Sequence, residues 1–300
     1  MGLDKKKKLL LFITILYAFI ILMMIISTII GTGEYNPLIS FLPIGNPMIE
    51  IVILMLVFYP LSMLLGCLIG QYGVFPLYLF FHKKFIGRKM EYGACFKPEE
   101  KVYKTKYNLF IPSFIAVNFS LLLVMNFEDL LIHLFLTEAT WNDTVQIFLV
   151  FDIFIITFTF TLLIAMAIYS PVWYLLESNI VYSNKKKVEY SRDPFEIRSV
   201  GSWYRTFLRG YAGIGLLIAY IQCLIFYFNN LVEQETFALQ IFILVVALMP
   251  FPIILALFGL WITLFLEITK EKRKKYITKL MKEFDIIKKV DDSMVKLDRK

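Results

Sequence analysis

The sequence predicts an all-α, polytopic membrane protein with six transmembrane helices. Apolar residues make up 59% of the 300 residues and charged residues only 18%, which is too apolar for a soluble globular surface. The apolar residues fall into six blocks long enough to cross the ~30 Å hydrocarbon core of a bilayer. Basic residues occur only in alternate connections between these blocks. Together, the blocks and the charge pattern indicate membrane spans.

The six blocks give the expected spans. They cover residues 9–30, 49–81, 108–125, 145–176, 207–228 and 237–268. Each span must be helical, because lipid offers no water to an open backbone and the two-residue alternation of a membrane barrel is missing. The second, fourth and sixth blocks run past thirty residues, so at ~1.5 Å per residue they exceed the bilayer core. These three helices are expected to tilt, bend or emerge from the membrane.

The basic residues predict the orientation. All 31 Lys and Arg residues lie in segments 1–8, 82–107, 177–209 and 270–300, and the remaining connections contain none. The positive-inside rule places these segments, and with them both termini, in the cytoplasm. We therefore expect a multi-pass protein of the cell membrane, with a six-helix transmembrane domain in residues 1–269 and a cytoplasmic tail in 270–300.

The tail has the pattern of a basic amphipathic helix. Ile277, Leu280, Phe284 and Ile287 share one helical face among many lysines. Such a helix lies on an anionic inner leaflet or binds an acidic partner. No nucleic-acid partner is expected, because the membrane topology already accounts for the positive charge.

A short internal similarity indicates a parallel duplication. Residues 89–93 (KMEYG) recur as residues 187–191 (KVEYS), and Pro76 and Pro171 precede them in similar aromatic contexts. We interpret this as two units of helix, basic loop and helix with the same orientation. Pro76 and Pro171 would then mark equivalent helix bends.

Polar residues within the spans form a candidate site. Asp152 is the clear ionisable residue in the spans, and Asn118 and Gln222 lie at a similar depth, ~10 Å below the outer ends of their helices. Thr159 lies two turns below Asp152 on the same face. One interpretation is a substrate, ion or proton site within the bundle. The other is a set of interhelical hydrogen bonds that fixes helix register.

The segment from Asp193 to Arg209 is a candidate docking site for a cytosolic or membrane protein. It combines an Asp-Pro helix start, apolar residues at helical spacing, a glycine and several arginines. It resembles the coupling loops of ABC-type permeases, although the usual alanine pair and later Leu-Pro are absent. The residues that would carry docking are Glu196, Arg198, Gly201, Trp203, Arg205 and Arg209.

No motif specifies a reaction. The sequence lacks a phosphate-binding loop, a nucleophile elbow and a zinc-protease helix, and its three cysteines and two histidines have no metal-ligand spacing. We expect no metal and no cofactor. A permease-like or transport-associated subunit is preferred, and an assembly or anchoring subunit of a larger membrane complex is the alternative. A membrane-embedded enzyme is a remote third, and self-association is left open.

The orientation is testable at Cys95. This residue lies in the predicted cytoplasmic segment 82–107 between Lys89 and Lys97. A membrane-impermeant thiol reagent should label Cys95 only after the membrane is opened, which mass spectrometry of the labelled peptide would detect. Labelling of Cys95 in intact cells would contradict the orientation.

Overall fold

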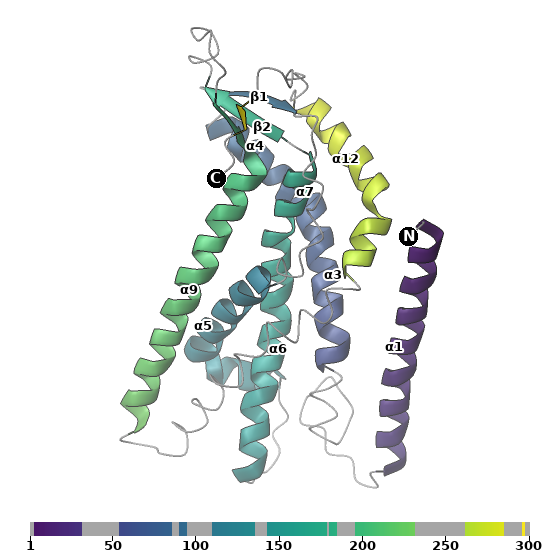
Figure 1. The fold of residues 1–300 in the computed structure, drawn as a ribbon. Coiled ribbons are helices and arrows are strands. Elements are labelled where there is room, and N and C mark those ends of the chain that lie inside the picture. Colours follow the sequence, from purple (N-terminus) through teal and green to yellow (C-terminus); the bar gives the residue numbers. More distant parts are fainter. Residues whose placement is uncertain are drawn as a thin grey trace.

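The computed structural model describes residues 3–31, 54–85, 90–94, 110–135, 143–178, 180–184, 196–231, 262–284 and 296–297. Within these residues the protein is almost entirely helical, with one small sheet at one end of the molecule (Figure 1). The prediction of an all-α fold is confirmed for this part of the chain.

The helices follow the apolar blocks closely. The α-helices are α1 (Leu3–Gly31), α3 (Tyr59–Ile69), α4 (Phe75–Phe85), α5 (Phe110–Phe135), α6 (Asp143–Tyr169), α7 (Pro171–Ser178), α9 (Val200–Leu231) and α12 (Lys270–Glu283), and the π-helical segments are η1 (Leu54–Phe58) and η2 (Gly70–Val74). A further helical stretch, 262–268, leads into α12. The first five expected spans therefore coincide with helices. Most of the sixth lies outside the described residues.

Successive helices alternate in direction (Figure 1). α1, α5 and α9 run away from the sheet end, whereas α3–α4 and α6–α7 run toward it. α5 bends at Phe127, where φ is −135° and ψ is 27°, so its last turns point away from the main helix axis. This bend separates the expected third span, residues 108–125, from the last turns of α5.

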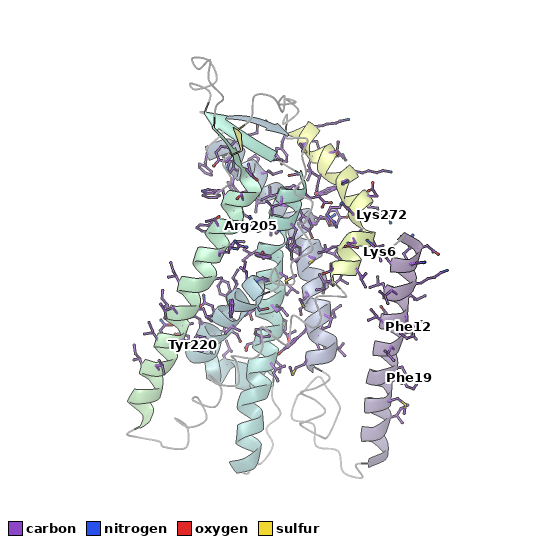
Figure 2. The ribbon with its side chains drawn as sticks, viewed as in Figure 1. Lys6, Phe12, Phe19, Arg205, Tyr220 and Lys272 are labelled. Carbon is purple, nitrogen blue, oxygen red and sulfur yellow. The ribbon has the colours of Figure 1, made fainter. Side chains whose placement is uncertain are left out.

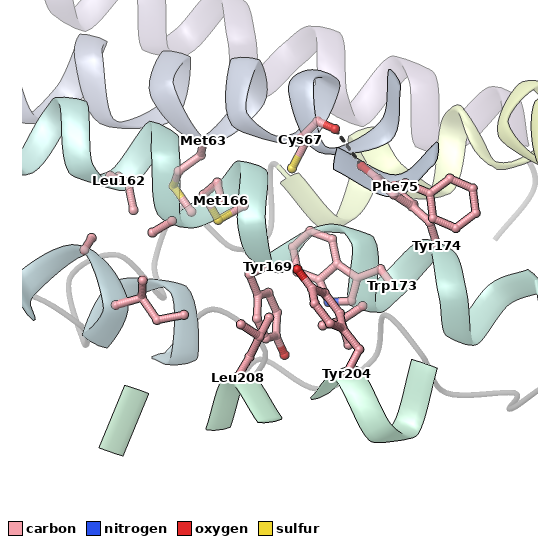
Figure 3. Close-up of a cluster of buried hydrophobic side chains, with 14 of the residues drawn as sticks. Met63, Cys67, Phe75, Leu162, Met166, Tyr169, Trp173, Tyr174, Tyr204 and Leu208 are labelled. Carbon is pink, nitrogen blue, oxygen red and sulfur yellow. Dashed lines mark hydrogen bonds between the residues drawn. The ribbon is translucent and has the colours of Figure 1, made fainter. Parts of the chain in front are cut away.

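The core forms around α6, which packs against both α3 and α5. Met63, Leu162, Met166 and Tyr169 are buried together there, and Trp173 continues the cluster toward the sheet end (Figure 3). Leu162, Met166 and Tyr169 form one stripe of α6, and Ile156 and Ala167 are buried on a different side of the helix. This placement explains why α6 is apolar around most of its circumference.

Two glycines let α3 approach α6 closely. A Cβ on Gly66 would lie 2.6 Å from the Leu163 carbonyl oxygen, and a Cβ on Gly70 would clash with the Ser170 hydroxyl. Gly66 and Gly70 are one turn apart, in the small-x-x-x-small spacing that brings two apolar helices into backbone contact. The close contact therefore requires glycine at both positions.

Both central helices break near the expected prolines. α3 passes through η2 into α4, whose second residue is Pro76, and α6 gives way at Ser170 to α7, which begins at Pro171. A proline lacks the N–H that would continue the hydrogen-bond ladder, so carbonyl groups are freed at each break. Tyr174 donates its hydroxyl to the Cys67 carbonyl at 2.9 Å, as Figure 3 shows. Tyr204 donates to the Ile168 carbonyl at 2.6 Å.

The sheet joins connections that lie far apart in sequence. β1 (Met90–Ala94) pairs antiparallel with β2 (Ile180–Asn184), with Tyr92 opposite Tyr182, and β2 pairs antiparallel with β3 (Glu196–Ser199). β3 then pairs parallel with β4 (Lys296–Leu297). The second copy of the proposed repeat motif, residues 187–191, lies outside the described residues.

Two helices of the described part are long and apolar enough to cross a membrane, judged by length and composition: Tyr59–Phe85 and Ile155–Ser178. The apolar window of the second is 78% buried inside the protein, as in the core helix of a soluble protein, but that of the first is only 33% buried. Tyr59–Phe85 therefore leaves most of its apolar surface exposed.

The close contact at Gly70 predicts that alanine destabilises the protein there and not at Gly210. Gly70→Ala should lower the free energy of unfolding by about 1–3 kcal/mol, because the added methyl group forces α3 away from Ser170. Gly210→Ala is the matched control, since an added Cβ at Gly210 meets nothing within 4 Å. Thermal unfolding in detergent measures both, and equal effects would show that close packing at Gly70 is not required.

Candidate functional site

Asn118 lies in the contact between α5 and α9. Its side chain is buried, and a Cβ on Gly215 of α9 would overlap the Asn118 amide nitrogen. The amide therefore occupies the space that a side chain at position 215 would take. This is a packing role that combines a polar residue on one helix with a glycine on the other.

Hydroxyl groups link α5 to α6 at the same level. Ser120 and Thr157 lie 3.0 Å apart, oxygen to oxygen, and both side chains are buried. Thr159 is also buried, but its hydroxyl donates to the Ile155 carbonyl of its own helix at 2.8 Å. These groups satisfy their hydrogen bonds through protein atoms.

The structure brings together only part of the predicted polar layer. Because α5 and α6 are antiparallel, the pairing of Ser120 with Thr157 places Asn118 opposite Thr159. Asp152 lies five residues beyond Thr157, ~8 Å farther along α6, and its side chain is outside the described ones. Gln222 is exposed on α9. Gln222 also lies seven residues beyond Gly215, the α9 residue that Asn118 contacts, which is ~10 Å farther along that helix. The predicted common level of Asn118, Asp152 and Gln222 is therefore wrong for Asn118.

The candidate docking segment is divided between the sheet and α9. Glu196 and Arg198 belong to β3, and Gly201 is buried where a Cβ would lie 2.8 Å from the Leu176 nitrogen. Trp203 is 46% exposed and stacks on Phe207, with ring centroids 5.9 Å apart. The first half of the segment thus serves the protein's own fold, and its second half remains accessible.

Arg205 and Arg209 lie one turn apart on α9. Arg205 is half-buried and Arg209 is exposed. Both arginines lie within electrostatic reach of Tyr169 on α6. Neither makes a salt bridge with a carboxylate of the described residues.

A buried ion pair that the sequence reasoning missed holds α12 against α7. Arg273 donates from Nε to Glu177 at 2.7 Å, and the two side chains are only 1% and 5% exposed. Its other nitrogens donate to the Thr269 hydroxyl at 3.0 Å and to the Leu266 carbonyl at 2.9 Å. The guanidinium also lies 5.5 Å from the ring centroid of Tyr174. Each of the three guanidinium nitrogens of Arg273 thus donates a hydrogen bond.

The tail helix packs on the protein itself. Ile277 and Leu280, two of the four residues expected on its apolar face, are buried, Phe284 is half-buried, and Ile287 lies outside the described residues. Tyr276 contacts the ring of Tyr72 at 5.0 Å. Burial, together with Tyr72 and Glu283, raises the pKa of Tyr276. The apolar face is therefore covered by helices of the bundle, while the lysines of α12 point outward.

His82 connects the same region through aromatic rings. It is buried at the end of α4, with ring centroids 5.3 Å from Tyr182 of β2 and 6.4 Å from Trp203 of α9. Tyr78, one turn earlier, lies 4.6 Å from the ring of Tyr204. These contacts fix α4, the sheet and α9 relative to one another.

The described residues contain no candidate metal site. Among the described residues, no group of three or more His, Cys, Asp or Glu side chains is placed to hold a metal ion. No family model matches the sequence, and comparisons with curated proteins and with solved structures found no significant match.

The buried ion pair predicts a non-additive mutational effect. Arg273→Met should cost about 3–5 kcal/mol of folding free energy, because Glu177 is left buried without its cation. The double variant Arg273→Met/Glu177→Leu should recover most of this loss, since apolar side chains can fill the same space. Thermal unfolding of the wild type, both single variants and the double variant gives the coupling energy. A single Arg273→Met variant as stable as the wild type would contradict the assignment.

Proposed function

We propose that the chain is a multi-pass protein of the cell membrane, with six spans and both termini in the cytoplasm. The exposed apolar side chains on the outer faces of the helices support this proposal most directly. They include Leu11, Phe12, Ile15 and Phe19 on α1 and Ile214, Leu217, Ile218 and Ile225 on α9. Contiguous apolar faces of this size are stable in contact with lipid and not with water.

The position of the basic side chains supports the orientation. Lys6, Arg205 and Lys272 lie toward the sheet end, whereas Phe12, Phe19 and Tyr220 lie farther from it (Figure 2). A basic band above an apolar belt is the arrangement expected at the cytoplasmic surface. The alternating helix directions agree with it. The sheet and α12 would then form a cytoplasmic cap.

The order of elements supports the proposed duplication. Each unit has a helix, a break near a proline, a second helix, a strand and a helix running back, and the second unit has the additional strand β3 before its last helix. α3, α4, β1 and α5 form the first unit, and α6, α7, β2 and α9 form the second. The antiparallel pairing of β1 with β2 is the geometry that a two-fold axis along the membrane normal would give to equivalent strands.

We further propose that the protein is a non-enzymatic assembly or anchoring subunit of a larger membrane complex. The observation that carries this proposal is the state of the described polar layer. Asn118 fills space at Gly215, and Ser120 and Thr157 bond to each other. Polar groups used in this way join helices. This ranks the assembly function above the permease-like function that the sequence alone favoured.

A permease-like or transport-associated function remains the second candidate, because both central helices are interrupted. The π-helical segment η2 and the break at Ser170 lie side by side across the Gly70 contact. Interrupted helices and π-segments recur at functional sites of membrane proteins. In this candidate Asp152 is the titratable group.

The partners follow from the surfaces. The anionic inner leaflet faces the lysines of the cytoplasmic cap, and the accessible Trp203–Phe207 stack is the expected contact for a cytosolic or membrane protein. Self-association through the apolar flanks would serve an assembly function equally well.

Thiol accessibility tests the assembly function against the permease-like function. Single cysteines are introduced at Asn118, Asp152 and Thr159 in a chain whose native cysteines are replaced by alanine. In opened membranes, a water-soluble thiol reagent should leave all three unlabelled, because a packed layer admits no water. Labelling at position 118 or 152 would instead indicate a hydrated path and favour transport.

The matched control retains only the native Cys95. It should be labelled under the same conditions, which shows that the reagent reaches the cytoplasmic side. The unfolding midpoint of each variant in detergent must match that of its cysteine-free parent, so that labelling does not report unfolding.

A further inference from the structure

We propose that α9 carries a binding site for one anionic phospholipid, whose phosphate is held by Arg205 and Arg209. The inference rests on the proposed membrane location and names a ligand for a surface of the same bundle. It begins from two arginines at i and i+4, a spacing that places both guanidinium groups on one side of the helix. Two planar forks at this spacing suit the oxygens of a single phosphate.

The charge at this position is uncompensated within the described residues. Salt bridges there join other pairs, such as Lys6 with Glu267 and Arg273 with Glu177, and none involves Arg205 or Arg209. Arg205 is half-buried, so its charge faces a partly desolvated environment near Tyr169. An anion supplied from outside the chain would neutralise both arginines.

The level of the site fits a lipid headgroup. In Figure 2, Arg205 lies toward the same end as Lys6 and Lys272, above the apolar belt marked by Phe12 and Tyr220. A soluble anion would not require an apolar surface directly below it. A phospholipid would, because its acyl chains extend from the phosphate toward the bilayer centre.

Among the described residues, nothing occupies the surface of α9 below the arginines, which leaves room there for an acyl chain. Gly213 follows Arg209 after one turn, and an added Cβ at Gly213 or at Gly210 would meet nothing within 4 Å. These glycines therefore have no packing partner in the described structure, although glycine weakens a helix relative to alanine. Leu217 continues the same face and is 61% exposed. From the sheet end, α9 thus presents Arg205 and Arg209, then Gly210 and Gly213 without a packing partner among the described residues, and then the exposed Leu217.

The experiment uses the full chain in phosphatidylcholine nanodiscs, with and without phosphatidylglycerol. Native mass spectrometry counts retained phosphatidylglycerol, and titration gives its apparent affinity. Because each near-surface arginine contributes about fivefold, Arg205→Gln/Arg209→Gln should weaken phosphatidylglycerol binding on the order of thirtyfold. Its unfolding midpoint in phosphatidylcholine alone should match that of the wild type.

The matched control removes the same charge elsewhere. Lys272 and Lys275 are exposed on α12, so Lys272→Gln/Lys275→Gln changes the net charge equally. This control should weaken phosphatidylglycerol binding several-fold less than Arg205→Gln/Arg209→Gln, because the lysines attract anionic lipid without holding one phosphate between them. An equal loss in both double variants would show a general surface-charge effect and overturn the site.

Two further arms separate the alternatives. Gly213→Leu should reduce phosphatidylglycerol retention by filling the bare stretch, and unchanged retention would overturn the acyl seat. Inorganic phosphate added to phosphatidylcholine nanodiscs should not raise the unfolding midpoint as phosphatidylglycerol does. An equal rise would identify a free-phosphate site and overturn the lipid assignment.

Failure of the membrane proposal is distinguishable from failure of the lipid site. Wild-type protein that is extracted from membranes by alkaline carbonate would overturn the membrane location itself. Protein that resists extraction and shows no preference for phosphatidylglycerol would overturn only the lipid site.

Discussion

The arrangement of the bundle depends on one constraint: polar backbone groups beside the helix breaks must find hydrogen-bond partners in an apolar interior. An unpaired carbonyl there costs several kcal/mol. Near the breaks at η2 and Ser170, tyrosine hydroxyls donate to two backbone carbonyls. Tyr174 serves Cys67 and Tyr204 serves Ile168. The Cys67 carbonyl also accepts from the Gly70 N–H, so the tyrosine gives it a second hydrogen bond. The close approach at Gly66 and Gly70 brings the two breaks near enough for this exchange.

The same donors connect the helix bundle to α12. Tyr174 bonds to α3 through its hydroxyl and presents its ring to Arg273 of α12. Arg273 in turn binds Glu177, three residues after Tyr174 on α7. A displacement of α12 would therefore disturb the helix interruption in α3. This mechanical link joins α12 to the interrupted helices of the bundle, and it is independent of which of the two proposed functions applies.

Local patterns predicted much of the helical arrangement and little of its long-range contacts. Five of the helices and the breaks near Pro76 and Pro171 were predictable, because block length and proline chemistry act within a few residues. The pairing of Glu177 with Arg273 joins residues 96 positions apart, and no local pattern specifies it. The Gly66-x-x-x-Gly70 spacing was a readable signal that was missed. The levels of Asn118 and Gln222 relative to each other were not predictable, because the packing of neighbouring helices decides how far each helix is displaced along its axis.

Because β1 pairs with β2, β1 cannot form its hydrogen bonds until β2 has been synthesised. Ala94 cannot complete its strand until Ile180 to Asn184 have been made, up to 90 residues later. At typical elongation rates of about 5–20 residues per second, this interval is about 5–20 s. During it, α3, α4 and α5 would be complete while β1 still presents an open edge. That edge would stay available for pairing with other chains until β2 emerges.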